Sequence, residues 1–281
     1  RNAAERSSTA DYIDLHKIIS VVDTSYHALQ AEYRRPLSRR LQMQATYTWS
    51  HAIDDDAIYG GIGFATIFGN ERGNADYDVR HLLNVSGTYL VPAPQIAGLN
   101  AALRDWHLEW IATARSGLPF DVLMLNSTPS ADAGAVQTPV IRGLYGFVRP
   151  NYNGAEVWVQ DSNVAGGKRL NPAAFAAPAT NKTGDLGRNI LYGRPMAQLD
   201  LALRREIPFT EGLRLNLAVQ AFNVTNTPAF ANPNRNEGGF LGSPVFGFPV
   251  RSLNASFAPN PTSFFAPGGP RSLQFAFRLQ F

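Results

Sequence analysis

The last eleven residues of the chain, 271–281, alternate between apolar and polar side chains. The odd positions from 273 read Leu, Phe, Phe, Leu, Phe, and the even positions from 272 read Ser, Gln, Ala, Arg, Gln. Successive side chains of a strand point to opposite faces, so this pattern predicts a strand with one apolar and one largely polar face. A transmembrane strand of an outer-membrane barrel has this pattern over about ten residues, with its apolar side toward lipid.

The same two-faced pattern recurs in six earlier segments. The clearest is 41–50, where Leu41, Met43, Ala45, Tyr47 and Trp49 alternate with Gln42, Gln44, Thr46, Thr48 and Ser50. The others are 26–34, 81–91, 106–115, 199–204 and 213–221, and an eighth strand is possible near 13–22. A short turn at 35–40 predicts that 26–34 and 41–50 form an antiparallel hairpin.

The connections between these segments alternate in length. Short turns follow the first, third and fifth strands, whereas the stretches 51–79, 116–195 and 223–270 are long and rich in turn residues. An up-and-down barrel with short periplasmic turns and long extracellular loops has this rhythm, and a sandwich does not. We therefore predict an all-β, antiparallel transmembrane barrel of which about 7–8 strands are present, so that the chain alone forms an open, curved sheet.

The alternation also assigns side chains to faces. We expect Leu215, Leu217, Leu273, Phe275 and Phe277 to face lipid, and Gln42, Gln44, Asn216, Gln220 and Gln274 to face the concave side. Aromatic residues near strand ends form a girdle at the membrane interfaces in such proteins. The candidates for this girdle are Tyr47, Trp49, Tyr89, Trp106 and Trp110.

Composition narrows the function without contradicting a barrel. The 281 residues include no Cys, so disulfides and Cys-ligated metals are excluded, and the formal net charge is only +3. No cluster of basic and aromatic residues supports nucleic-acid binding, and no apolar run approaches the roughly 20 residues of a transmembrane helix. The start, residues 1–6, lacks Met and an apolar core, so we interpret the chain as the carboxy-terminal piece of a longer protein.

The sequence gives no support for a catalytic or metal site. The run Asp54-Asp55-Asp56 could bind a cation, but its spacing is not that of an EF-hand and we interpret it as a solvated loop. The five His residues show no metal-ligand spacing, and the chain has no Gly-x-Ser-x-Gly nucleophile elbow. We expect no enzymatic activity, cofactor or metal.

Several phrases in this order resemble one family. They are Ser25 to Gln30 with 41–55, Asn74 to His81, Ser116 to Phe120, Gly187-Arg188-Asn189, and Ala221 to Asn226. Together they resemble the carboxy-terminal part of the barrel of Oar-like TonB-dependent receptors of the carboxypeptidase-regulatory-like-domain type, common in Acidobacteria. The resemblance covers the chain from about Ser25 to Phe281. Residues 1–22 are then the end of a preceding loop or strand, and the plug domain lies outside the chain.

The resemblance implies an integral outer-membrane receptor that takes up an unknown extracellular ligand. Its implied partners are outer-membrane lipid, the TonB system acting through the plug, and the barrel assembly machinery. The machinery is expected to recognise the last strand, so Phe275, Phe277, Leu279 and Phe281 are the candidate assembly signal. Two alternatives stay open: an adhesin or structural barrel without transport, and a soluble, secreted glycan-binding β-sandwich.

Overall fold

A computed structural model gives the arrangement of most of the chain. It describes residues 23–55, 58–59, 62–63, 72–93, 96, 100–125, 147–179, 184–210, 212–233, 238–249, 251–253 and 268–281. The eighth strand expected near 13–22 lies outside these residues. No helix in the described ranges is long and apolar enough to cross a membrane.

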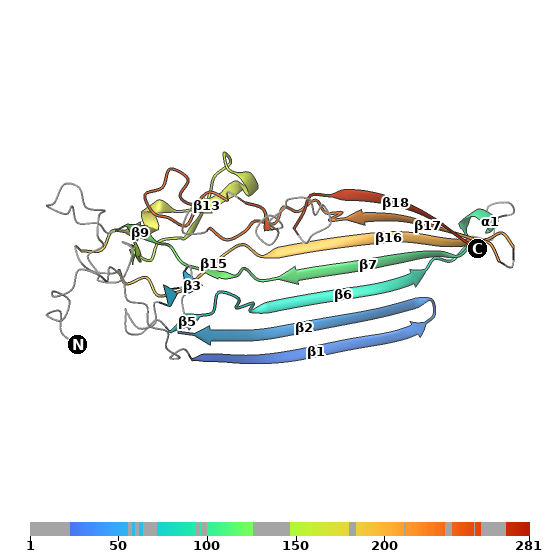
Figure 1. Ribbon diagram of the computed structural model, residues 1–281, viewed down its shortest axis with the longest axis horizontal. Coiled ribbons are helices and arrows are strands. Elements are labelled where there is room, and N and C mark those ends of the chain that lie inside the picture. Colours follow the sequence, from blue (N-terminus) through green and yellow to red (C-terminus); the bar gives the residue numbers. More distant parts are fainter. Residues whose placement is uncertain are drawn as a thin grey trace, which may run out of the picture.

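Seven long strands form one antiparallel sheet (Figure 1). They are β1 (Thr24–Ser38), β2 (Leu41–Asp54), β6 (His81–Leu90), β7 (Trp106–Arg115), β16 (Met196–Pro208), β17 (Arg214–Phe222) and β18 (Ser272–Gln280). Each pairs with its neighbours in chain order, and the two-residue strand β5 (Gly73–Asn74) adds to the end of β2. The predicted all-β fold with up-and-down topology is confirmed.

The first hairpin is tighter than the sequence pattern indicated. Ser38 pairs with Leu41, so β1 and β2 continue almost to the turn and only Arg39 and Arg40 connect them. Both of these residues have positive φ, 49° and 73°. Two residues with positive φ are the signature of a type I′ turn, whose twist matches that of the flanking strands. The expected turn over 35–40 was therefore too long, because a register shift between Arg35 and Ser38 lets the strands pass Pro36.

The sheet is open. Within the described part of the chain, β1 and β18 lie at the two ends of the strand order and are not paired with each other. A small closed barrel would have joined them. The prediction of an open sheet is confirmed, and two long strands are left with edges that no described residue covers.

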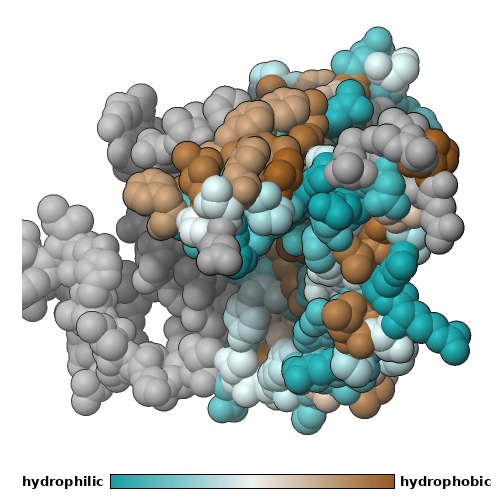
Figure 2. All heavy atoms as spheres, turned by 90° about the vertical axis from the view of Figure 1, so that its right-hand side faces the viewer, coloured by the Kyte–Doolittle hydropathy of each residue, from teal (hydrophilic) through white to brown (hydrophobic). Residues whose placement is uncertain are grey.

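The apolar face of the sheet is exposed rather than packed in a core. Leu273 and Phe275 are each 63% exposed and Phe277 is 75% exposed. Leu215 and Leu217 face the same way, opposite Leu279 and Phe277. Figure 2 looks along the strands from the short-turn end and shows apolar side chains gathered toward the top, over the part of the sheet that β17 and β18 form. The sandwich alternative is wrong, because a sandwich would bury this face against a second sheet.

The connections differ at the two ends of the sheet. At one end lie the two-residue turn, the short turn after β16 and the connection that carries α1 (Asn100–Leu103); we call this the turn end (Figure 1). At the other, the loop end, the long connections carry small elements. These are β3 (Ile58–Tyr59), β4 (Ile62–Gly63), β8 (Pro119–Phe120), β9 (Met124–Leu125), β10 (Phe147–Val148), β11 (Asn151–Tyr152), β12 (Trp158–Gln160), η2 (Ala165–Gly167), β13 (Lys168–Leu170), η3 (Pro172–Ala174), β14 (Phe175–Ala176) and β15 (Leu191–Tyr192).

Part of these connections folds into a small body with its own apolar core. We call the described residues among 118–125, 147–178, 184–193 and 238–248 the cap. Its core contains Phe120, Val122, Leu170, Phe175 and Leu191, all less than 7% exposed. The sequence indicated only weak structure over 116–195, because two- and three-residue strands are too short to show a period. Tertiary contacts between distant loops order them instead.

Candidate functional site

The polar residues predicted to face the lumen share one face of the sheet, which we call the polar face. The cross-strand register places them in rows, and one row runs across six strands. It consists of Gln42, Thr88, Glu109, Ala202, Gln220 and Gln274. Two rows further toward the loop end lie Thr46, Asn84, Thr113 and Gln198, with Thr113 Oγ1 donating to Asn84 Oδ1 at 3.0 Å. Amides and hydroxyls therefore dominate this face, and both donate and accept hydrogen bonds.

A hollow of about 410 Å³ lies over this face. Ser86 and Thr88 on β6 are small and form its floor, whereas Gln42 and Gln44 on β2 and Glu109 on β7 stand on either side. Most of its lining side chains belong to the polar face. Gln42 and Gln44 line this hollow and lie on the polar face, as expected for side chains that face the lumen.

Three carboxylates on the polar face have arginine partners. Glu109 on β7 meets Arg204 on β16 at 3.0 Å, and Glu206 meets Arg214 across the β16–β17 hairpin at 2.8 Å. Near the hollow, Glu32 accepts from Arg34 at 2.5 Å. Exposed pairs of this kind stabilise the fold by only about 0–1 kcal/mol each. Their effect is to keep the polar face near neutrality.

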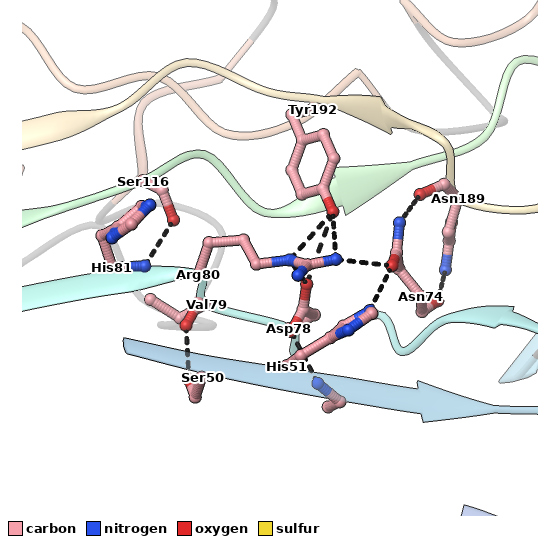
Figure 3. Close-up of polar contacts among 11 residues, drawn as sticks. Ser50, His51, Asn74, Asp78, Val79, Arg80, His81, Ser116, Asn189 and Tyr192 are labelled. Carbon is pink, nitrogen blue, oxygen red and sulfur yellow. Dashed lines mark hydrogen bonds and ion pairs between the residues drawn. The ribbon is translucent and has the colours of Figure 1, made fainter. Parts of the chain in front are cut away.

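A second group of polar residues lies where the sheet meets the cap, and it is centred on a buried carboxylate. We call His51, Asn74, Asp78, Arg80 and Tyr192 the loop-base cluster (Figure 3). Asp78 is 1% exposed, and it accepts from the Ala52 backbone N–H at 2.7 Å and from Arg80 Nε at 2.9 Å. Arg80 also reaches Tyr192 Oη at 3.3 Å and Asn74 Oδ1 at 3.2 Å. His51 Nε2 lies 2.9 Å from the same Asn74 oxygen.

The cluster continues into the cap through Asn189. Its side-chain amide donates to the Asn74 carbonyl at 2.8 Å and to Asp76 Oδ1 at 2.6 Å, and its backbone N–H donates to Asp121 Oδ1 at 2.6 Å. Asn189 is 1% exposed and has φ of 50°. Asn tolerates this left-handed conformation better than most residues, which explains its place at this turn.

The neighbouring Arg188 forms a buried ion pair with Asp54. Its Nη1 lies 2.5 Å from Asp54 Oδ1 and donates to the Asp54 carbonyl at 2.9 Å. The interpretation of Asp54-Asp55-Asp56 as a solvated loop is wrong for Asp54, which ends β2 and is 7% exposed. Asp55 is partly exposed and accepts from the Asp23 backbone N–H, while Asp56 lies outside the described residues.

Two further contacts fasten the connections at this end. Asn223 is 3% exposed; its side chain accepts a hydrogen bond from the Thr227 backbone N–H and donates one to the Gly269 carbonyl at 2.8 Å. These two bonds join both ends of the β17–β18 connection. Arg194 lies with its guanidinium 4.7 Å from the ring centre of Phe230. Burial lowers the pKa of Arg194 from its ordinary value, but an arginine stays protonated at neutral pH, so the cation–π contact persists.

The phrases that carried the resemblance meet at these contacts. Asn74 to His81 supplies most of the loop-base cluster, Gly187-Arg188-Asn189 supplies its bonds to the cap, and Asn223 fastens the last connection. The alternation of apolar and polar residues in the sequence could not predict these contacts, since the residues lie outside the regular strands or at their ends. The arrangement orders the cap over the loop end of the sheet. Among the described residues, no group of three or more His, Asp or Glu side chains is placed to hold a metal ion.

The structure places the girdle candidates at different levels of the apolar face. Tyr47 and Trp49 lie toward the loop end, where Trp49 is opposite His81, and Tyr89 and Trp106 lie toward the turn end. Trp49 and Tyr89 are eight residues apart along the ladder, about 27 Å at 3.4 Å per residue. A strand tilt of about 40° reduces this to about 20 Å, near the height of an outer-membrane apolar band. Trp110 lies between the two levels.

The proposed assembly residues form one side of β18. Phe275, Phe277 and Leu279 lie opposite Val219, Leu217 and Leu215. Phe281 follows the strand and is 99% exposed. Their role stays a prediction.

Comparison with known proteins gives one match. A family model described as an outer membrane beta barrel domain matches residues 1–258. The match spans β1 to β17, and β18 joins the same sheet by pairing with β17 along its length. No curated protein and no solved structure matches the chain.

Proposed function

We propose, from the premise that the chain belongs to the outer membrane beta barrel domain family, that it forms part of the wall of an Oar-like TonB-dependent receptor. The family places the chain in the bacterial outer membrane. The apolar face of the sheet then contacts lipid and the polar face lines the lumen.

The observation that carries the proposal is the open sheet, which has an exposed apolar face on one side and a polar face with a hollow on the other. Barrels of eight strands have interiors that side chains fill or that hold one small ligand, and barrels of about 22 strands enclose a plugged lumen. Seven long strands end here in two unpaired edges within the described residues, with a hollow over small side chains such as Ser86 and Thr88. Further strands would cover these edges, since an uncovered edge invites aggregation.

Transport in this proposal requires no chemistry from the chain. A ligand enters from the loop end, past the cap, and binds through hydrogen bonds from side chains on the loops and the polar face. The force that displaces the plug comes from the TonB system. The paired charges on the polar face suit a neutral wall along which a plug can move, because no described carboxylate among Glu32, Glu109 and Glu206 lacks a cationic partner.

Assembly of the barrel is part of the same proposal. Outer-membrane lipid and the barrel assembly machinery are the partners of the chain. To the machinery β18 offers alternating side chains and an edge that no described strand covers. Backbone hydrogen bonds give affinity in strand addition, and side-chain pockets give specificity. Phe275, Phe277, Leu279 and Phe281 supply the apolar side of this strand.

The decisive experiment uses the full-length protein extracted from outer membranes in mild detergent. It is passed over an immobilised periplasmic domain of TonB from the same bacterium, with an unrelated porin as the control. Retention of the protein, but not of the porin, is the expected result. Equal behaviour of the two would refute TonB dependence and favour the second candidate.

The second candidate is an adhesin or structural barrel without transport. The cap favours it, since a folded body with its own core at the outer end can present a fixed surface to another cell. Swelling of proteoliposomes in stachyose tests a separate possibility, an open porin-like pore. A plugged receptor and an adhesin both give no swelling, so only the TonB column separates them.

A further inference from the structure

The two-residue turn of the first hairpin contains an unfavourable choice of residues. Arg39 and Arg40 both have positive φ, which costs free energy for any side chain with a Cβ. Asn-Gly is the preferred pair at these two positions. Both arginines are exposed, and no hydrogen bond or ion pair of their side chains is found among the described residues. A strained backbone whose side chains have no partner in the described part of the chain is a reason to look for a function of the charges.

Two further arginines lie at the same turn end of the sheet. Arg104 precedes β7, and its side chain is 58% exposed with Asp105 3.5 Å away. Arg205, on the apolar face of β16, lies opposite Trp106 with its guanidinium 5.8 Å from the ring centre. We call Arg39, Arg40, Arg104 and Arg205 the arginine rim.

Backbone hydrogen bonds show that the rim is continuous. The Leu90 N–H donates to the Arg40 carbonyl at 2.8 Å, and the Val91 N–H donates to the Trp106 carbonyl at 2.8 Å. At the turn end of the sheet the rim therefore runs from the first turn past the end of β6 to the start of β7 and on to β16. Strands are about 4.8 Å apart, so the rim spans roughly 15 Å.

Exposed apolar side chains accompany the arginines. Leu37, Leu103 and Phe209 lie at the turn end and are 69%, 42% and 57% exposed. Apolar side chains, Trp and Arg together are typical of the zone between hydrocarbon and headgroups, where Arg extends its charge toward the polar layer. Arg205 and Trp106 also lie on the apolar face of the sheet, which contacts lipid in the proposed barrel.

We propose that the arginine rim binds the phosphate groups of anionic phospholipids in the periplasmic leaflet of the outer membrane. Short turns lie on the periplasmic side of these barrels, which fixes the leaflet. A guanidinium offers two parallel donors to a phosphate, a geometry that Lys does not match. Arg204 and Arg214 of this end face the lumen, away from lipid, where they pair with Glu109 and Glu206. The inference depends on the barrel and its orientation and not on transport.

The test replaces the turn by the sequence that its backbone prefers. Arg39→Asn with Arg40→Gly removes two charges and should fold at least as well as the natural turn. The matched control is Arg271→Gln with Arg278→Gln, which removes the same charge from the loop end of β18 and from the polar face.

Each full-length protein is reconstituted into vesicles of 70% phosphatidylcholine and 30% phosphatidylglycerol and excised with a styrene–maleic acid copolymer. Mass spectrometry then gives the ratio of the two lipids around the protein relative to the vesicle. A basic residue near an anionic surface changes binding by about fivefold. The turn variant should therefore lose most of the phosphatidylglycerol enrichment that the natural protein shows. The control should keep it.

Equal enrichment in the turn variant and the natural protein would overturn the proposal, as would an equal loss in the control, which would show a general effect of net charge. Heat-modified migration on gels confirms that each variant is folded before its lipids are counted.

Discussion

A charge placed on one face of β6 should be far more harmful than the same charge on the other face. Val85 is the fifth of the ten residues of β6 and faces outward, between Ala45 and Ala112. Ser86 is the next residue, faces the hollow, and lies between Gln44 and Ile111. Val85→Arg and Ser86→Arg therefore differ in the face they alter and hardly at all in position.

The register gives the depth of Val85. It is four residues from the level of Trp49 and four from Tyr89, about 13 Å along the strand in each direction. Val85 thus lies near the middle of the apolar band, where a lipid-facing Arg costs about 2–4 kcal/mol. That range is roughly a 30- to 700-fold loss in the folding equilibrium. Ser86→Arg extends into a hydrated hollow and should change the folding free energy by less than about 1 kcal/mol.

The assay is folding of each full-length variant into phospholipid vesicles over a guanidinium series, followed by heat-modified migration on gels. The midpoint for Val85→Arg should fall well below that of the natural protein, and the midpoint for Ser86→Arg should stay close to it. Equal shifts, or a larger shift for Ser86→Arg, would show that the lipid and lumen faces are assigned the wrong way round.

Three other substitutions test separate parts of the structure. Gly87→Val should destabilise the sheet by about 1–3 kcal/mol in the same assay, because a Cβ at Gly87 would lie 2.2 Å from Trp110 Cζ2. A double variant that also carries Trp110→Ala should recover part of this loss. Arg188→Met should leave the Asp54 carboxylate buried without its guanidinium, at a cost of about 3–5 kcal/mol, and the cap should be digested faster by protease in intact cells. A variant that also carries Asp54→Leu should resist the protease better than Arg188→Met alone. If it does not, the ion pair is not what holds the cap. Phe281→Ala removes a side chain whose burial in lipid is worth only about 1.5–3 kcal/mol. A large drop in folded protein in outer-membrane fractions would therefore favour an assembly signal. Normal amounts would leave Phe281 as a lipid anchor.

The alternation of side chains determined the sheet. A strand exposed to lipid on one side and water on the other must repeat with period two, and this constraint acts on every residue of a segment such as Leu41 to Ser50. The strands, their antiparallel order and the two faces could therefore be predicted from the sequence. Strand ends could not, because pairing with a neighbour extends β1 to Ser38 and β2 to Asp54 beyond the visible pattern.

Only the tertiary structure decided the loop end. Asp78, Asn189 and Asp54 look like ordinary loop residues in the sequence, yet each is buried and bonded to a partner far along the chain. No local signal marks such residues, because burial of a polar group depends on whether a distant segment supplies its hydrogen bonds. The cap arises in the same way: its core joins residues from Phe120 to Phe246, and contacts between distant segments leave no period in the sequence.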